Sequence, residues 1–500
     1  MSKETIRDWY RREVIGKGDK GSKLLAKLCT APTLDNCRYV DVIKEGMNRM
    51  AVLRVPEDYY VVVHSAGGDP EKTDLAEHAG SLVDRLVEQA RAIGAEPAAF
   101  ADVIDSNTGD KPMLETIASA LVAKADEYGL TIMNGENAIL GARINPDIQA
   151  NVSGTMISLM KKEDWKKFKT ENEISAALPV SFMHRCASYA VFDPEAKPVI
   201  INSDGVGTKT EFYERVRKYW LALRDFMAMN LDDASKSGAT VMAVSGVAET
   251  KGTIRVSALH HHAGEYGKEI GVMCTLQHED VGDRLMGYHE DAPSYNISGS
   301  VVSVIDEERL RNPLKPGEGE TLIAIVHKPN PRSNGISAKR RNMVARFGAD
   351  YHKTEEGKLF LEFLTQPSTI LYPIFKELID KGLATSVYHM SGGAYNGKLA
   401  KPLAEEGLFV KIEDLFEPDW RELALAGFSL TSAEDAYAQW PMGNDGFIST
   451  KNPDAAIKLL EERGYQARKV GVLEKASDGK TGVELTACNR EKVYFSGKAA

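Results

Sequence analysis

Apolar and polar positions alternate along the chain in segments with the lengths of strands and helices. The apolar runs 59–63 and 198–202 are short and rich in valine or isoleucine, which is typical of buried strands. Each run is followed by a glycine-containing turn and then by a long stretch with helical spacing of apolar residues, 75–94 and 212–238. A second strand and helix follow in both places. Alternation of this kind predicts an α/β fold with helices layered on sheets.

The same pattern occurs twice. Asn151–Ser158 reads NVSGTMIS and Asn296–Ser303 reads NISGSVVS, and the two match by identity or close substitution at every position, at an offset of 296 − 151 = 145 residues. The segment HSAGGDPEKT from His64 likewise matches NSDGVGTKT from Asn202. We therefore predict two tandem copies of one domain, residues 1–165 and 170–308, which form an internal pseudo-dimer.

A third domain follows these copies. A polar segment rich in glycine and proline begins at Lys315 and leads into the strand-like run 321–326. Helix-like and strand-like segments then alternate to the end of the chain. We predict one C-terminal α/β domain over residues 310–500.

Composition limits the functions that need be considered. A chain of 500 residues with 43% apolar residues is long enough for roughly two to four globular domains. The net charge of −10 argues against a general nucleic-acid-binding protein, because no excess of lysine and arginine is present to neutralise phosphates. Small phosphorylated ligands remain compatible with this charge.

The chain has no predicted membrane segment. No window approaches the ~18 consecutive apolar residues of a membrane-spanning helix, and residues 1–23 lack the apolar segment of a signal peptide. The cysteines are scattered without zinc-ligand spacing, so we expect reduced, mostly buried thiols and a cytoplasmic protein. They are Cys29, Cys37, Cys186, Cys274 and Cys488.

The turn after the strand 198–202 carries candidate chemistry. It reads SDGVGTK, with an acid at Asp204, glycines at Gly205 and Gly207, and Thr208 and Lys209 before the helix. Flexible backbone N–H groups beside a carboxylate suit a phosphate and its metal ion. The competing interpretation is an ordinary turn between a strand and a helix.

The two copies differ where a site would need charge. Ungapped alignment places Ala66 opposite Asp204 and Glu71 opposite Lys209, so only the second copy has the acid and the lysine. Such complementary loss is expected of a pseudo-dimer that keeps one of two symmetric sites, although drift alone would also produce it.

The first copy has an acid of its own. Glu136 follows a strand-like run on a glycine turn, NGENA, whereas the second copy has no Gly-Glu pair there. The corresponding acid in the second copy, Glu279, depends on where the alignment gap is placed. Asp232 and Asp233 add carboxylates in NLDDASKSG; Mg²⁺ typically takes one or two carboxylates plus phosphates and waters. Solvated acids at the end of a helix are the alternative for this pair.

Two loops of the third domain combine small and polar residues. One contains Ser333 and Asn334 in NPRSNGIS, and the other contains His389, Gly392 and Gly393 in YHMSGGAYNG. Glycines at these positions would let a ligand phosphate approach backbone N–H groups. A plain turn is the competing interpretation of either loop.

The order of these motifs resembles a known family. SDGVGTK, then MAMNLDDASKSGA, then an SNG loop and HMSGGAYNGKLAKPLA, is similar to aminoimidazole ribonucleotide synthetase, the phosphoribosylformylglycinamidine cyclo-ligase of purine biosynthesis. The first copy is also similar to that family through GAEP at 94–97 and NGEN at 134–137. The similarity covers most of the chain.

The resemblance implies an enzyme that uses ATP and Mg²⁺. In that family ATP phosphorylates a formamide oxygen and an amine then attacks to close the imidazole ring, so the implied substrates are a nucleotide and a ribotide. The residues carried over as catalytic or nucleotide-binding are Asp204, Asp233, Glu136, Lys209, Gly205, Gly207, Thr208 and Asp232. Of these, Asp204 and Asp233 are the implied metal ligands.

The substrate side would be lined by the third-domain loops. The implied residues are Arg332, Ser333, Asn334, His389, Gly392 and Gly393. The family also pairs its N-terminal domains across a dimer interface, so a homodimer is compatible with this chain, although the internal pair of copies could make one chain self-sufficient.

Several departures keep alternatives open. The glycine-rich loop of the family is replaced by AALPVSFMHRCASYAVF at 176–192, Arg332 stands where a histidine usually precedes SNG, and Ala394 replaces a glycine. The main expectation is a cyclo-ligase that converts formylglycinamidine ribonucleotide to aminoimidazole ribonucleotide. The alternatives are a relative that binds a nucleotide or ribotide without cyclising it, and a ligase similar to formylglycinamidine ribonucleotide synthetase.

Overall fold

The computed structural model describes most of the chain, in stretches that cover residues 22–42, 51–165, 188–289, 292–429, 432–477 and 479–497. The chain forms two units, each described by itself below. The first unit comprises Met1–Glu214 and Ala239–Pro313, and the second comprises Arg215–Gly238 and Leu314–Ala500.

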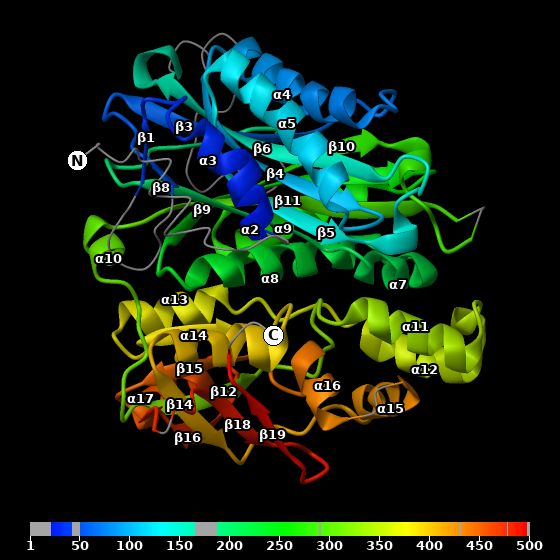
Figure 1. Cartoon of the computed structure of the whole chain (residues 1–500), viewed down its shortest axis with the longest axis vertical. Coiled ribbons are helices and arrows are strands. Elements are labelled where there is room, and N and C mark those ends of the chain that lie inside the picture. Colours follow the sequence, from blue (N-terminus) through cyan, green and yellow to red (C-terminus); the bar gives the residue numbers. More distant parts are fainter. Residues whose placement is uncertain are drawn as a thin grey trace. The chain divides into compact units, whose positions relative to one another are not determined.

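The first sheet of the first unit has the strand order β5-β4-β6-β3-β7 (Figure 1). Its strands are β3 (Tyr59–Gly67), β4 (Glu96–Ser106), β5 (Thr131–Ile139), β6 (Ala150–Lys161) and β7 (Ala190–Phe192). Strands β4 and β5 are parallel, and the other neighbours are antiparallel. The parallel pair is joined by a helix, as a parallel connection requires.

The second sheet repeats this order. It runs β1-β2-β8-β11-β9-β10, so that β10-β9-β11-β8 corresponds to β5-β4-β6-β3, again with one parallel pair, β9 and β10. Its strands are β1 (Val40–Val42), β2 (Ala51–Leu53), β8 (Val199–Gly205), β9 (Thr240–Lys251), β10 (Met273–Asp280) and β11 (Ser294–Val304). The predicted α/β class with two copies of one plan and a further α/β part is confirmed.

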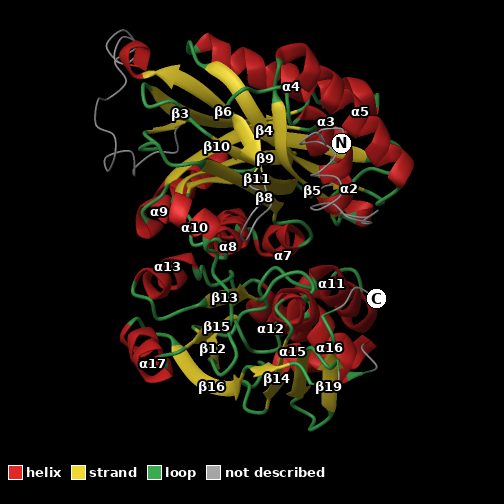
Figure 2. Cartoon of the chain, turned by 60° about the vertical axis from the view of Figure 1, so that its left-hand side comes forward, coloured by secondary structure: helices red, strands yellow, loops and turns green. Residues whose placement is uncertain are grey.

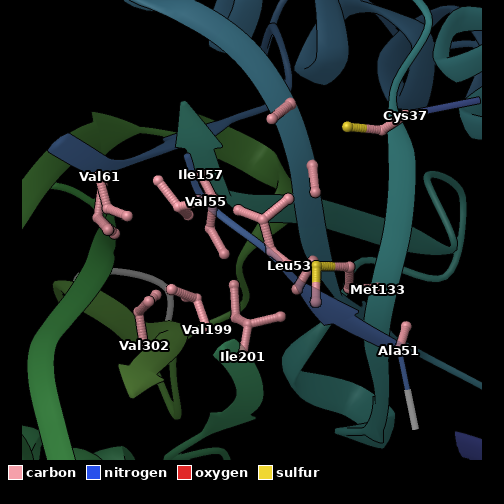
Figure 3. Packing of buried hydrophobic residues seen from close by; sticks show 14 of the residues in the cluster. Cys37, Ala51, Leu53, Val55, Val61, Met133, Ile157, Val199, Ile201 and Val302 are labelled. Carbon is pink, nitrogen blue, oxygen red and sulfur yellow. The ribbon is translucent and has the colours of Figure 1, made fainter. Parts of the chain in front are cut away.

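The two sheets pack face to face through an apolar layer. Figure 3 shows Val61 and Ile157 of the first sheet pointing toward Val199, Ile201 and Val302 of the second. All these side chains are more than nine-tenths buried. Their removal from water is the main term that holds the sheets together.

Helices cover the outer faces. α4 (Leu75–Ala92) and α5 (Lys111–Tyr128) lie over the first sheet (Figure 2) and pack on it through a second apolar cluster. α9 (Val256–Ile270) packs against β10. The remaining helical segments of this unit are α2 (Ser22–Leu25), η2 (Ala26–Thr30), α3 (Ala31–Thr33), η3 (Gly141–Arg143), η6 (Gly282–Arg284) and α10 (Glu307–Arg311).

The prediction of one continuous helix over 212–238 is wrong. The structure has α7 (Lys209–Val216), a short 3₁₀ turn η5 (Tyr219–Leu221) and α8 (Ala222–Ser235). Arg217 adopts φ = 57°, in the left-handed region that ends a helix. The apolar spacing continues across this break, which is why the sequence alone reads as one helix.

The second unit has two four-stranded sheets. The orders are β13-β15-β12-β16 and β17-β14-β18-β19. The strands are β12 (Thr321–Val326), β13 (Ser386–His389), β14 (Leu408–Ile412), β15 (Gly446–Thr450), β16 (Gln466–Val472), β17 (Glu474–Lys475), β18 (Gly482–Thr486) and β19 (Lys492–Phe495). The predicted strand over 321–326 is therefore confirmed.

Helices flank these sheets as the sequence predicts, and α13 and α17 contribute to the main apolar core with strands β12, β13 and β15. The helical segments are α11 (Ile336–Phe347), η7 (Tyr351–Lys353), α12 (Glu355–Leu364), α13 (Tyr372–Asp380), η8 (Tyr395–Ala400), α14 (Lys401–Glu405), α15 (Trp420–Ser429), α16 (Ala433–Gln439) and α17 (Pro453–Glu462).

Some predictions fall outside these elements. The boundaries 1–165, 170–308 and 310–500 stay predictions, as does common descent of the two copies. Cys186 and most of the segment 176–192 lie outside the described residues. Cys29, Cys37 and Cys488 are thiols outside any disulfide; the first two are buried, whereas Cys488 is exposed. Within the described ranges, none of the helices has the length and apolar character needed to cross a membrane.

Candidate functional sites

The SDGVGTK turn connects β8 to α7 in the first unit. Asp204 is partly exposed and accepts a hydrogen bond from the Gly205 N–H at 2.7 Å. Gly207 has φ = 65°, and a Cβ there would lie 3.1 Å from Leu140 Cδ2, so a side chain would be strained. The turn thus presents a carboxylate and backbone N–H groups directly before a helix N-terminus.

A buried ion pair holds α7 behind this turn. Arg143 of η3 binds both oxygens of Glu214 at 2.7 and 3.0 Å, and each side chain is no more than 3% exposed. Arg143 also donates to Thr210 Oγ1 and to the Tyr295 carbonyl, both at 3.0 Å. These contacts fasten the helix that follows the second copy's motif to a segment of the first copy.

Glu136 lies beside the same turn. Strands β5 and β8 are in contact, with Asn134 Nδ2 donating to the Ile201 carbonyl at 3.1 Å. Leu140, just after β5, meets Gly207, just after β8. Glu136 and Asp204 lie between these two contacts and both are partly exposed. The structure therefore brings into contact the two segments, from different copies, that carry these predicted residues.

Lys209 does not have the exposed position expected of a phosphate ligand. It is fully buried at the start of α7, with its ammonium 5.7 Å from the centre of the Tyr213 ring. Thr208 is also buried. Contact of either side chain with a phosphate stays a prediction, because the side chain would first have to leave its buried position. Binding of a phosphate by the backbone of the turn would not require this movement.

The corresponding turn of the first copy is built differently. In the strand registers Ala66 pairs with Gly154 and Asp204 pairs with Gly299, so Ala66 occupies the position of Asp204. The alignment predicts the same correspondence. Arg85 of α4 binds the Gly67 carbonyl at 2.7 Å. The protein's own groups thus fill this turn.

The registers also resolve the placement of Glu279. Glu136 pairs with Val103, the equivalent of Val247, whose partner is Gln277. Gln277 is therefore the counterpart of Glu136, and Glu279 is not. Glu279 instead forms a 2.8 Å ion pair with Arg85.

In the second unit, Asp233 lies at the centre of a polar cluster with His389. Asp233 Oδ1 is 2.9 Å from His389 Nε2 and 3.3 Å from Lys398 Nζ, and it also pairs with Lys236. Ser391 Oγ is 3.3 Å from the same histidine nitrogen. We call Asp233, Lys236, His389, Ser391 and Lys398 the basic cluster.

Charges within the basic cluster set its protonation. Burial alone would raise the pKa of Asp233, but Lys236, Lys398 and His389 hold it well below its usual value. Burial, and then the charge of Lys236, lower the pKa of His389 well below its usual value, so the imidazole is neutral near pH 7. Burial also lowers the pKa of Lys236 to about 8. With two lysines and one aspartate, the cluster carries a net positive charge that suits an anion.

Asp232 and Arg332 bind each other rather than standing ready for a ligand. Arg332 donates to Asp232 Oδ2 at 2.8 Å, and both side chains are no more than 2% exposed. The other oxygen, Oδ1, accepts from the N–H groups of Leu371 and Tyr372 at the start of α13. These contacts favour a structural role for both residues, in place of the phosphate and substrate roles implied by the resemblance.

The SNG loop retains unused polar atoms. Ser333 Oγ and Asn334 Nδ2 are buried and have no hydrogen-bond partner among the described residues. Gly335 has φ = 62°, and a Cβ there would lie 2.1 Å from the Trp440 ring, so only glycine fits. The loop thus packs closely against Trp440, while two of its polar groups are available to a ligand.

The loop after His389 is also constrained. Gly393 has φ = 83°, and Ala394 has φ = 36°, a conformation that a side chain rarely adopts. The π-helix η8 begins at Tyr395 and carries Lys398 back toward Asp233. A Cβ added at Gly392 would meet no described atom within 4 Å, so the backbone at this point is open to approach by a ligand.

Mg²⁺ suits the donor atoms of the Asp204 turn. Asp204 and Glu136 offer partly exposed carboxylate oxygens, the ligand type that Mg²⁺ prefers. In the part of the chain that the structure describes, no group of three or more His, Cys, Asp or Glu side chains could hold a metal. A metal at this turn would therefore need phosphate or water oxygens as well. The joint metal role of Asp204 and Asp233 stays a prediction, since they belong to different units.

Sequence reasoning missed both lysines of the basic cluster. Lys236 follows Asp233 by three residues, a spacing at which side chains can pair at the end of a helix, so this contact could have been found. Lys398 lies in the π-helix η8 and reaches Asp233 from 165 residues along the chain. No local pattern indicates that conformation.

One segment of the chain matches a model of a known protein family. Residues 47–156 match the family model described as AIR synthase related protein, N-terminal domain. The matched segment contains β3 to β5 and most of β6, which is the copy without the SDGVGTK motif.

Solved structures give distant similarities. Escherichia coli HypE, a hydrogenase maturation protein, has 13% identity and a TM-score of 0.40 over 60% of this chain and 86% of its own. A structure of HypE in complex with ATP has 11% identity and a TM-score of 0.40 over 61% and 86%. Thermotoga maritima PurL complexed with AMPPCP has 12% identity and a TM-score of 0.37 over 61% of this chain and 45% of its own. Similarities at this level carry no conclusion about function.

Proposed function

We propose that the protein binds ATP with Mg²⁺ at the Asp204 turn and catalyses an ATP-dependent ring closure, the conversion of formylglycinamidine ribonucleotide to aminoimidazole ribonucleotide. The observation that carries this proposal is the contact between β5 and β8, which bring Glu136 and Asp204 from different copies to one region beside a glycine turn at a helix N-terminus. A carboxylate pair next to backbone N–H groups is suited to a triphosphate and its metal.

Each group would have a defined task. Asp204 and Glu136 would hold Mg²⁺, which when bound neutralises phosphate charge during transfer. The N–H groups of residues 207–209 would bind phosphate oxygens, whereas those of Gly205 and Val206 already donate to Asp204 and to the Ile297 carbonyl. The pair Arg143–Glu214 keeps α7 in place, so that these donors need not reorganise when the nucleotide binds.

The basic cluster and the SNG loop would bind the ribotide. The net positive charge around Asp233 suits the substrate phosphate, with Gly392 and Gly393 allowing close approach to the backbone. Ser333 Oγ and Asn334 Nδ2, which have no hydrogen-bond partner within the described ranges, would hydrogen-bond to the ribotide. We assign Asp233 to this cluster rather than to the metal, because Lys236, Lys398 and His389 already share its charge.

A binding protein without ring closure is the second candidate. Complete burial of Lys209 and the pairing of Arg332 with Asp232 favour it, because both remove charged side chains that the resemblance assigns to ligands. Such a protein would be stabilised by ATP or ribotide without releasing phosphate. A ligase acting on another ribotide would release ADP only with that ribotide.

The test is turnover of purified protein with ATP, Mg²⁺ and formylglycinamidine ribonucleotide, with ADP and aminoimidazole ribonucleotide measured together. Substrate-dependent formation of both products supports the cyclo-ligase. A rise in Tm with ATP but no product would reject catalysis and leave the binding protein. Glu279→Gln is the matched control for any loss in Asp204→Asn, since Glu279 lies at the equivalent turn of the other copy.

A further inference from the structure

The space between the two sheets of the first unit changes character along the strands. Next to the apolar layer of Figure 3 come hydroxyl groups that bond across the sheets, with Ser65 Oγ 2.7 Å from Ser245 Oγ and Ser153 Oγ 2.7 Å from Ser298 Oγ. At the next inward-facing positions, beyond Ser153 and Ser298 toward the strand ends, the residues are asparagines and acids. Polar groups in this place need partners, because the layer is sealed from water.

Four residues form this outermost layer, and they obey the pseudosymmetry of the unit. Asp105 pairs with Asn151 across β4 and β6, and Glu249 pairs with Asn296 across β9 and β11. Directly opposite residues on neighbouring strands place their side chains on the same face. Each side chain is no more than 2% exposed.

The two halves of the layer meet. Asn296 Nδ2 donates to Asp105 Oδ2 at 2.5 Å, which joins the second sheet to the first. Glu249 lies within electrostatic reach of Asp105 and faces both Asn151 and Asn296. The four side chains therefore converge from four strands near the local two-fold axis marked by Ser153 and Ser298.

Oxygen acceptors are in excess in this cluster. Asp105 Oδ1, both carboxylate oxygens of Glu249, Asn151 Oδ1 and Asn296 Oδ1 have no hydrogen-bond partner among the described residues. The donors near these acceptors that likewise lack a partner among the described residues are Asn151 Nδ2 and Nε of the buried Arg284, and Arg284 lies within electrostatic reach of Glu249. Five buried acceptors cannot all be satisfied by these two donor groups, whereas a bound cation would satisfy several of them together.

We infer that Asp105, Glu249, Asn151 and Asn296 form a binding site for one hard divalent cation that joins the two sheets. Carboxylate and amide oxygens are the ligands that Mg²⁺, Mn²⁺ and Ca²⁺ prefer. The site is distinct from the Asp204 turn, because its ligands come from the inner faces of β4, β6, β9 and β11.

Without a cation the two acids must hold protons instead. Burial, opposed by the Asn296 hydrogen bond, raises the pKa of Asp105 to about 7, and the Asp204 charge adds to the rise. Burial, and then the charge of Asp105, raise the pKa of Glu249 well above its usual value. Binding of a cation would displace these protons, so its affinity should increase with pH.

Mn²⁺ is a suitable probe because the number of bound ions per chain can be measured in the absence of nucleotide. The full chain is stripped with EDTA, equilibrated with Mn²⁺ alone at pH 8 and assayed for retained metal and for Tm. We expect one retained Mn²⁺ and a higher Tm, and both effects should be lost in Glu249→Gln and in Asp105→Asn. Asp204→Asn and Glu279→Gln are the controls and should retain the ion, which separates this site from the proposed nucleotide site.

Diffraction from the wild-type chain provides a test that needs no variant. An anomalous signal at the manganese edge among the four side chains would support the site. Retention of Mn²⁺ by Glu249→Gln, or a signal only at the Asp204 turn, would overturn it. Absence of retained Mn²⁺ in the wild type, with a higher Tm for Glu249→Gln, would also overturn it and would show that protons satisfy the acids.

Discussion

The two equivalent turns of the first unit share a backbone plan and differ in side chains. At one, here called the Asp204 end, β8 leads into a partly exposed carboxylate, and Glu136 approaches from β5. At the other, here called the Gly67 end, β3 leads into Ala66 and Gly67, and the Arg85–Glu279 pair occupies the turn. One end presents partly exposed carboxylates, while the other fills its turn with an internal ion pair.

The buried arginines behind the two ends show the same difference. Arg143 donates to the Tyr295 carbonyl and Arg284 donates to the Ala150 carbonyl, which are pseudosymmetric contacts. Arg143 also binds a carboxylate, that of Glu214. Arg284 Nε has no hydrogen-bond partner among the described residues, and burial lowers the pKa of this arginine. Two halves with the same strand order can therefore keep equivalent backbone contacts while their charged side chains are compensated differently.

The largest expected effect comes from removing the paired arginine. Arg143→Met leaves Glu214 buried without its partner and should lower the free energy of unfolding by about 3–5 kcal/mol. Arg284→Met leaves backbone carbonyls rather than a buried carboxylate without their donor and should cost less, about 1–3 kcal/mol. Urea unfolding of both variants measures the difference. Equal losses would mean that the two ends do not differ in the way their charges are compensated.

The next largest effect is expected on turnover, which should differ between variants at the two ends. Asp204→Asn should lower ATP-dependent turnover by about 10²–10³, in the range found when one electrostatic contact of a transition state is removed. Glu279→Gln should leave turnover unchanged, because that carboxylate binds Arg85 at the opposite end. Steady-state ADP release measures both, with Tm recorded to confirm folding. A loss in Glu279→Gln equal to that in Asp204→Asn would contradict the assignment.

Acid should weaken the Gly67 end through His78. This imidazole is buried; Nδ1 donates to the Asp69 carbonyl and Nε2 accepts from the Val152 N–H, and the accepting nitrogen requires the neutral form. Burial lowers the pKa of His78 to about 4. Because the folded pKa is below the unfolded value, stability is retained above about pH 6.5 and lost as pH falls toward 4, by about 2 kcal/mol at pH 5.

Comparison of the wild type with His78→Gln checks this prediction. The variant should be less stable at pH 7 but should lose less stability between pH 7 and pH 5. Chemical unfolding at both pH values measures the slope. Parallel slopes would show that His78 does not control the acid response.

The smallest effect is expected from the ion pair at the Gly67 end. Arg85 and Glu279 are 31% and 14% exposed, so solvent screens their attraction. The double variant Arg85→Gln with Glu279→Gln should change the free energy of unfolding by less than about 1 kcal/mol. A double-mutant cycle gives the pair energy directly. A coupling above that value would mean that this pair holds the two sheets together.

The repeated strand pattern in the sequence predicted much of the fold. Runs such as 59–63, 198–202 and 321–326 lie in strands, and the matching NVSG and NISG segments lie in equivalent strands β6 and β11. These features depend on local periodicity, which a single sequence contains. The break between α7 and α8 was missed because it depends on one left-handed residue, Arg217, within continuous helical spacing.

The candidate residues were predicted less completely. Asp204 and Glu136 were recognised from glycine turns, but their approach to each other depends on how β5 and β8 pack. Arg332 and Asp232 were expected to contact ligands, and instead they neutralise each other in a buried pair. The sequence shows which charged groups exist, but not which of them satisfy one another.

The sequence by itself thus determined the secondary-structure pattern and the available chemical groups. These are two copies of a strand-and-helix pattern, a third α/β part, and an acid-glycine turn in one copy alone. Tertiary structure decided which charges meet, including Arg143 with Glu214, His389 with Asp233, and Asp105 with Glu249 near the local two-fold axis. The reason is physical. Periodicity acts over neighbouring residues, whereas burial and charge compensation act between elements far apart in the chain, 71 residues for Arg143 with Glu214 and 191 for Asn296 with Asp105.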